Sequence, residues 1–119
     1  MKAILLVSHG SRSTKTKDEV SLLVNLISQR LHGLIVEYAF LEIESPSIPE
    51  GIDRCASQGA TQIALILNFL NAGRHVDQDI PSIVHAAQKK YPQIKFAVSK
   101  PIGQHAKLPL LLIDLINNA

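Results

Sequence analysis

Ala3-Ile4-Leu5-Leu6-Val7, followed at once by Ser8-His9-Gly10-Ser11-Arg12, is the stretch that decides the fold. The five apolar residues are typical of a buried strand, and the polar residues after them end it. A second wholly apolar run, Ile63-Ala64-Leu65-Ile66-Leu67, leads shortly to Asn71-Ala72-Gly73-Arg74-His75. Continuous apolar runs indicate strands that are covered on both faces of a parallel sheet. The two runs therefore predict such a sheet, with a histidine after each of two strands.

The rest of the chain alternates between strand and helix patterns. Apolar runs predict strands at roughly residues 2–8, 34–41, 62–68 and 94–98. Helical spacing of apolar residues follows each strand, with Pro49 suited to a first helical turn and Gly59 to a helix end. The order βαβαβαβα predicts an α/β fold, a mostly parallel sheet of about four strands with helices on both faces. The apolar run Leu110–Ile113 in the last helix indicates a second buried face, and hence a dimer.

Length and composition exclude several classes of protein. The 119 residues predict a single domain spanning 1–119. Aromatic residues make up 4% and the net charge is +2, so nucleic acid is not an expected partner. No apolar stretch approaches the roughly 20 residues of a membrane span, and no secretory signal is evident. The one cysteine, Cys55, cannot form an intrachain disulfide, reads as a core residue and favours a reducing compartment. We expect a soluble, cytoplasmic protein without a membrane partner.

Polar side chains follow every predicted strand. In an open α/β sheet, ligands bind beyond the carboxyl ends of the strands. The loops there carry His9, Glu42, His75 and His105, one after each strand. Neutral imidazole is a good ligand for late first-row divalent metals, and a carboxylate can complete such a site. The same imidazoles can accept protons near neutral pH, so metal or proton chemistry is predicted at this edge.

The same loops suit a large anionic ligand. Gly10 and Gly73 allow the backbone to approach a flat or bulky molecule closely. Arginine and lysine side chains offer counter-charges for carboxylates or phosphates, and here they are Arg12, Arg74, Lys100 and Lys107.

Each of these residues also has a plainer interpretation. His9 could be a hydrogen-bonding residue at a strand end, and His75 could merely begin a helix. Glu44, two residues after Glu42, could take the role of Glu42. His105 could be a structural cap and Ser11 a helix cap, while Arg12 and Arg74 could only solvate their loops. His32 and His85 lie in or at the ends of helical patterns, where surface roles are expected.

Four ordered motifs carry a resemblance to a known family. They are Ser8-His9-Gly10-Ser11-Arg12, Ala39-Phe40-Leu41-Glu42, Phe69–Val76 with Asp79-Ile80-Pro81, and Pro101-Ile102-Gly103-Gln104-His105. Together they span almost the whole chain, which resembles the short sirohydrochlorin cobaltochelatases, small CbiX-type members of the class II tetrapyrrole chelatases. The resemblance implies the chelatase-like fold. It also implies a half-size chain that forms a homodimer, because longer relatives look like two fused copies.

The resemblance implies a specific reaction. A divalent ion, with Co2+ as the first candidate, is inserted into sirohydrochlorin without ATP, and two pyrrole protons leave. The reaction would be a step of cobalamin biosynthesis. His9 and His75 would bind the ion and take protons, and Glu42 would be a third ligand or would orient an imidazole. Substrate contacts would come from Ser11, Arg12, Gly73, Arg74 and His105. No permanently bound cofactor is implied, because the metal is a substrate.

Alternatives remain open at this point. Fe2+ for sirohaem and Ni2+ for coenzyme F430 use similar ligands, and the tetrapyrrole could be an amidated sirohydrochlorin. A non-enzymatic module that only binds metal or tetrapyrrole is a further alternative. Neither a Gly-x-Gly-x-x-Gly nor a phosphate loop is present, which argues against a nucleotide-binding module.

Overall fold

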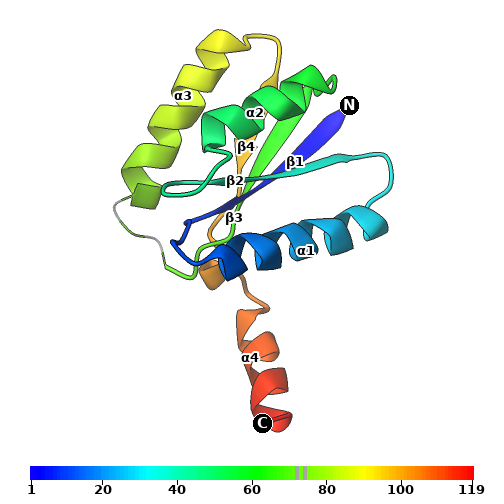
Figure 1. Cartoon of the computed structure of the whole chain (residues 1–119), viewed down its shortest axis with the longest axis vertical. Coiled ribbons are helices and arrows are strands. Elements are labelled where there is room, and N and C mark those ends of the chain that lie inside the picture. The colour runs from blue at the N-terminus through cyan, green and yellow to red at the C-terminus, as the bar shows by residue number, and fades with distance from the viewer. Residues whose placement is uncertain (72, 74) are drawn as a thin grey trace.

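The computed structural model describes residues 1–71, 73 and 75–119, and the side chains of all of these except 75 and 76. Its elements follow the predicted order (Figure 1). The strands are β1 (Lys2–Ser8), β2 (Ile35–Phe40), β3 (Gln62–Leu67) and β4 (Lys95–Val98). The helices are α1 (Thr14–Arg30), α2 (Ile48–Ser57), α3 (Ile80–Lys90) and α4 (Leu108–Asn117), with a π-helical turn η1 (His75–Asp79) and a 3₁₀ turn η2 (Ile102–Gln104).

The four strands form one sheet in the order β2-β1-β3-β4, and every pairing is parallel. Val7 of β1 lies opposite Ala39 of β2 and Leu67 of β3. This register brings the carboxyl ends of the three strands to one edge. The α/β fold class and the parallel sheet predicted from the sequence are therefore confirmed.

The sheet packs a larger apolar cluster on one face and a smaller one on the other. Leu5, Val7 and Leu65 belong to the larger buried cluster, which also holds side chains of α2 and α3. Leu6 and Phe40 form a smaller cluster with Val20 and Val24 of α1 on the opposite face. Cys55 is fully buried in the larger cluster, as its sequence context predicts.

The start of α2 shows how local sequence sets an element boundary. The Ser47 hydroxyl accepts a hydrogen bond from the Glu50 backbone N–H, and the Glu50 carboxylate accepts one from the Ser47 N–H. This reciprocal capping box satisfies two N–H groups that the helix leaves unpaired. Pro49 occupies the first turn, as predicted, and Gly59 lies just beyond the end of the helix with φ +94°.

The last helix departs from the layered arrangement. Figure 1 shows α4 projecting away from the sheet beyond η2. All of its residues except Leu108 are exposed, including Leu110 at 64% and Ile116 at 70%. Helices do cover both faces of the sheet, as predicted, but within this chain they are α1 on one face and α2 with α3 on the other. No described helix is long and apolar enough to cross a membrane.

Candidate functional site

The loops after β1 and β2 are joined closely at the carboxyl edge of the sheet. The backbone N–H of Leu41 donates to the Ser8 carbonyl at 2.9 Å, and that of Glu42 donates to the His9 carbonyl at 3.1 Å. Gly10 has φ +105°, and a Cβ added there would lie 1.9 Å from the Glu42 carbonyl oxygen. Only glycine fits this position, because a side chain would force the loops apart.

This junction brings His9 and Glu42 together. Nε2 of His9 lies 2.9 Å from Oε1 of Glu42, and both side chains remain about half exposed. The His9 ring also meets the Phe69 ring edge-on, with centroids 6.0 Å apart. A carboxylate in contact with an imidazole orients the ring, and the two groups together can also ligate one ion. The geometry therefore supports both roles considered for Glu42.

Glu44 is directed elsewhere, although it follows Glu42 by two residues. Its carboxylate accepts a hydrogen bond from the Ser11 backbone N–H at 3.2 Å. Ile43 between them has φ +71°, which turns the backbone sharply. Of the two carboxylates that the sequence left open, Glu42 is the one that contacts His9.

The other predicted residues are placed as follows. Ser11 has a structural contact, because its Oγ accepts from the Ser13 N–H at 3.1 Å before α1. Arg12 is exposed, and Gly73 borders open space. Arg74 lies outside the described residues. The His75 backbone begins η1, just after the loop that follows β3, whereas its side chain lies outside the described part.

His105 lies between η2 and α4, just before the last helix begins. Its Nδ1 accepts a hydrogen bond from the Lys107 backbone N–H at 3.0 Å, a local contact just before α4. It borders a different cavity from the one that His9 lines. Across the residues whose side chains the structure describes, no group of three His, Cys, Asp or Glu side chains is close enough to hold a metal. The described part of the predicted metal site is thus the His9–Glu42 pair.

The loop after β4 is fitted tightly against the loop after β3. The Gly103 N–H donates to the Phe69 carbonyl at 3.0 Å. A Cβ on Gly103 would lie 1.5 Å from the Leu70 carbonyl oxygen, so a larger residue cannot occupy this position. The contact braces the segment that carries Phe69, the ring against which His9 packs.

A cavity of about 320 Å³ adjoins His9 on the α1 side of the sheet. Polar side chains that the sequence did not single out line it: Ser8, Thr16, Glu19 and Asn68. Ser8 is buried, and its Oγ accepts from the Asn68 side-chain amide at 3.1 Å. Ser8 ends β1 and Asn68 follows the adjacent strand β3, and these positions could have marked both residues from the sequence. Glu19, by contrast, resembles any exposed carboxylate on a helix.

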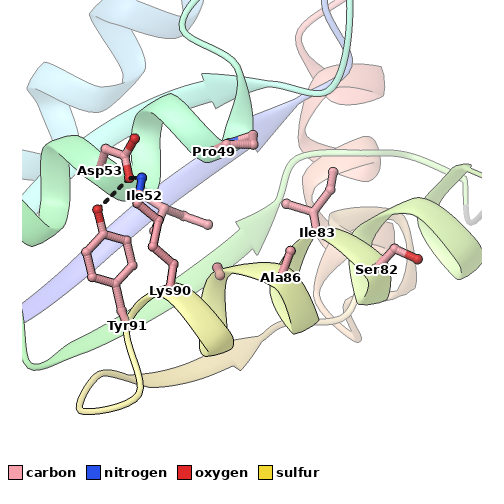
Figure 2. A pocket seen from close by; sticks show the side chains of 9 residues that line it. Pro49, Ile52, Asp53, Ser82, Ile83, Ala86, Lys90 and Tyr91 are labelled. Atoms are coloured by element: carbon pink, nitrogen blue, oxygen red, sulfur yellow. Dashed lines mark hydrogen bonds and ion pairs between the residues drawn. The ribbon is translucent and has the colours of Figure 1, made fainter.

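A second cavity, of about 310 Å³, lies between α2 and α3 (Figure 2). Its walls are mostly apolar, and Asp53 closes one end, where its carboxylate accepts hydrogen bonds from Tyr91 Oη at 2.5 Å and Lys90 Nζ at 3.0 Å. Both contacts lower the pKa of Asp53, the tyrosine contact more strongly. No residue predicted to act on a ligand lines this cavity.

Comparisons with known proteins agree with the fold and the motifs. The family model described as CbiX matches residues 3–119. A sirohydrochlorin cobaltochelatase from Methanosarcina acetivorans is 35% identical, and the alignment covers 98% of this chain and 95% of the relative. A sirohydrochlorin ferrochelatase from Priestia megaterium is 33% identical over 98% of this chain and 44% of the relative.

A solved structure gives the same result in three dimensions. The sirohydrochlorin chelatase SirB from Bacillus subtilis subspecies spizizenii, in complex with cobalt, superposes with a TM-score of 0.87 at 32% identity. The match covers 98% of this chain and 50% of SirB. The chain spans 34–49% of the length of four curated relatives. The family model and the curated relatives together show that this chain belongs to the CbiX family of chelatases.

Proposed function

We propose that this protein inserts a divalent metal ion, Co2+ in the first place, into sirohydrochlorin without ATP. The observation that carries the proposal is the His9–Glu42 contact of 2.9 Å at the carboxyl edge of the sheet, where this fold class binds ligands. Relatives named sirohydrochlorin cobaltochelatase and ferrochelatase support the substrate class. The reaction exchanges two pyrrole protons for one M2+ ion, so it needs metal ligands and proton acceptors in one place.

The residues divide this work as follows in our proposal. His9 binds the incoming ion and accepts a pyrrole proton, because a neutral imidazole can do either. Glu42 orients His9 and adds a negative charge beside the ion. His75 supplies the second imidazole, supported by its backbone position just after the loop that follows β3. Arg12 and Arg74 neutralise carboxylates of the tetrapyrrole, and Ser11, Gly73 and His105 lie in the surrounding loops.

Relatives of both metal specificities match this chain, so Fe2+ is the principal alternative to Co2+ and Ni2+ a further one. Imidazole and carboxylate ligands bind all three ions. The same site could act on an amidated sirohydrochlorin, or bind metal or tetrapyrrole without insertion. A cobalamin pathway and a cytoplasmic location are part of the proposal, the latter supported by the single cysteine.

The test is a spectroscopic assay of insertion. Purified protein is mixed anaerobically with sirohydrochlorin and, separately, Co2+, Fe2+ or Ni2+, and the visible spectrum is followed. We expect rapid conversion, fastest with Co2+, and a loss of at least a hundredfold in His9→Ala. His32→Ala, at the opposite edge of the sheet between α1 and β2, is the matched control and should be unaffected. Equal rates in His9→Ala and His32→Ala would contradict the assignment of His9.

We further propose that two copies form a homodimer through α4. SirB is covered to 50% by this chain, so a single SirB chain has room for a second unit of this size. A cavity of about 560 Å³ beside α1 and β3 has an apolar floor that includes Leu6, Ile27 and Ile66. The exposed apolar side chains of α4 from a second copy are suited to cover it.

A further inference from the structure

The cavity beside His9 is lined by a carboxylate that comes from a different element than the carboxylate in contact with His9. Glu42 approaches His9 from the loop after β2, whereas Glu19 reaches the cavity from the second turn of α1. Glu19 is the one acidic side chain among the residues that line this cavity. One carboxylate therefore contacts His9, and a second, from another element, lines the cavity that His9 borders.

The size of the cavity matches a hydrated ion and not the macrocycle. Its volume of about 320 Å³ corresponds to roughly ten water molecules at about 30 Å³ each. Drug-sized ligands already fill about 300–1,000 Å³, and a macrocycle of four linked rings with eight carboxylates is larger than most of them. The cavity thus has room for a metal ion with its water shell and is small for the ring.

The chemistry of the walls suits the stepwise exchange of that water shell. Hydroxyls of Ser8 and Thr16, the amide of Asn68 and the carboxylate of Glu19 present oxygen atoms. The hydrogen bond between Asn68 and Ser8 holds two of these groups in place. Oxygen donors replace water on a divalent ion at little cost, and imidazole then binds late first-row ions more strongly. The walls thus combine weak oxygen donors with one imidazole, which is the stronger ligand.

We propose that Glu19 is a positioning residue that draws the hydrated divalent ion into this cavity and delivers it to His9. The inference rests on the proposed function, because delivery has a purpose only if His9 receives the metal. The ion enters from the α1 side, between this helix and the ends of β1 and β3. The tetrapyrrole reaches His9 from outside the cavity, so metal and macrocycle do not compete for one path.

The test separates the Michaelis constants for the two substrates. In Glu19→Gln we expect the KM for Co2+ to rise about five- to tenfold, with kcat at saturating metal and the KM for sirohydrochlorin both within twofold of wild type. Asp18→Asn is the matched control, since it removes the same charge from the adjacent position, which does not line the cavity. It should change neither constant by more than twofold, and Glu19→Asp should restore part of the loss.

Two kinetic results would overturn the proposal. Equal rises in the metal KM for Glu19→Gln and Asp18→Asn would mean that the negative charge of α1 as a whole attracts the ion, and not Glu19 in the cavity. A fall in kcat with an unchanged metal KM would give Glu19 a role in proton transfer instead. If the wild-type protein inserts no metal at all, the proposed function fails independently. Titration with Co2+ alone, followed by calorimetry, then decides: weaker binding in Glu19→Gln than in Asp18→Asn supports the role, and equal binding refutes it.

Discussion

At the scale of single residues, the site depends on small groups that permit close approach. Gly10 allows the loop after β1 to touch the loop after β2, and that contact sets the distance between His9 and Glu42. Gly103 does the same between the loops after β3 and β4. The chemistry-bearing side chains are thus positioned by backbone contacts in which they take no part.

Gly10→Ala tests this dependence. The new Cβ would meet the Glu42 carbonyl oxygen at 1.9 Å and would also suffer the cost of a left-handed backbone. We expect a loss of about 2–4 kcal/mol in the free energy of unfolding, from clash and backbone strain together. Urea denaturation followed by circular dichroism measures it.

The matched control is Gly33→Ala, where φ is +82° and an added Cβ meets nothing within 4 Å. It should cost only about 1–2 kcal/mol, which is the penalty of the left-handed conformation alone. Equal losses in the two variants would show that the loop contact at Gly10 contributes nothing.

Cys55 is a residue whose chemistry is suppressed by its surroundings. Burial, assisted by the negative charge of Glu37, raises the pKa of its thiol to about 12. The thiol therefore stays protonated at neutral pH, and the thiolate is the form that reacts or binds metal. Its place in the core agrees with the interpretation from sequence.

At the scale of elements, α2 and α3 are joined by a polar contact at one end of an otherwise apolar groove. The Asp53 carboxylate on α2 accepts hydrogen bonds from Tyr91 and Lys90, which stand at the end of α3 (Figure 2). The Asp53 side chain is 46% exposed, so solvent screens much of the attraction. The contact therefore adds little to the stability of the fold.

Asp53→Asn should therefore lower the free energy of unfolding at pH 7 by only about 0.5 kcal/mol. The pKa of Asp53 is lowered in the folded protein, so its contribution is present above the ordinary aspartate pKa of about 3.9 and is lost as the pH falls. The difference between wild type and variant in urea denaturation should shrink between pH 5 and pH 3. A difference that grows on acidification would contradict the lowered pKa.

At the scale of the whole molecule, α4 is the feature that a lone chain leaves unexplained. Six of its apolar side chains are at least half exposed: Leu110, Leu111, Leu112, Ile113, Leu115 and Ile116. Burying half of this exposed surface on each of two helices would contribute roughly 5–10 kcal/mol. That is comparable with the cost of association, about 4–15 kcal/mol, so a stable dimer needs further contacts between the two copies besides those of α4.

Light scattering tests the dimer. The mass of one chain is 13.0 kDa, and we expect about twice that value at micromolar concentration. Double substitutions along one face of α4, Leu111→Glu with Leu115→Glu or Leu112→Glu with Ile116→Glu, should shift at least one variant to the monomer mass. Asn118→Glu adds a charge just beyond the helix and should leave the dimer intact. A wild-type protein that scatters as a monomer would contradict the homodimer.

The sequence by itself determined the order of the elements, the parallel sheet and the edge at which His9 and Glu42 stand. Those features follow from local patterns, since apolar runs specify strands and parallel strands end at a common edge. The resemblance favoured Glu42 over Glu44, but the local pattern left Glu44 open, because the separation of the two carboxylates depends on the backbone turn at Ile43. The place of Glu19 and the outward course of α4 were also decided only by tertiary structure. Both depend on how a helix lies across the sheet, and helical periodicity reports which face is apolar but not what it meets.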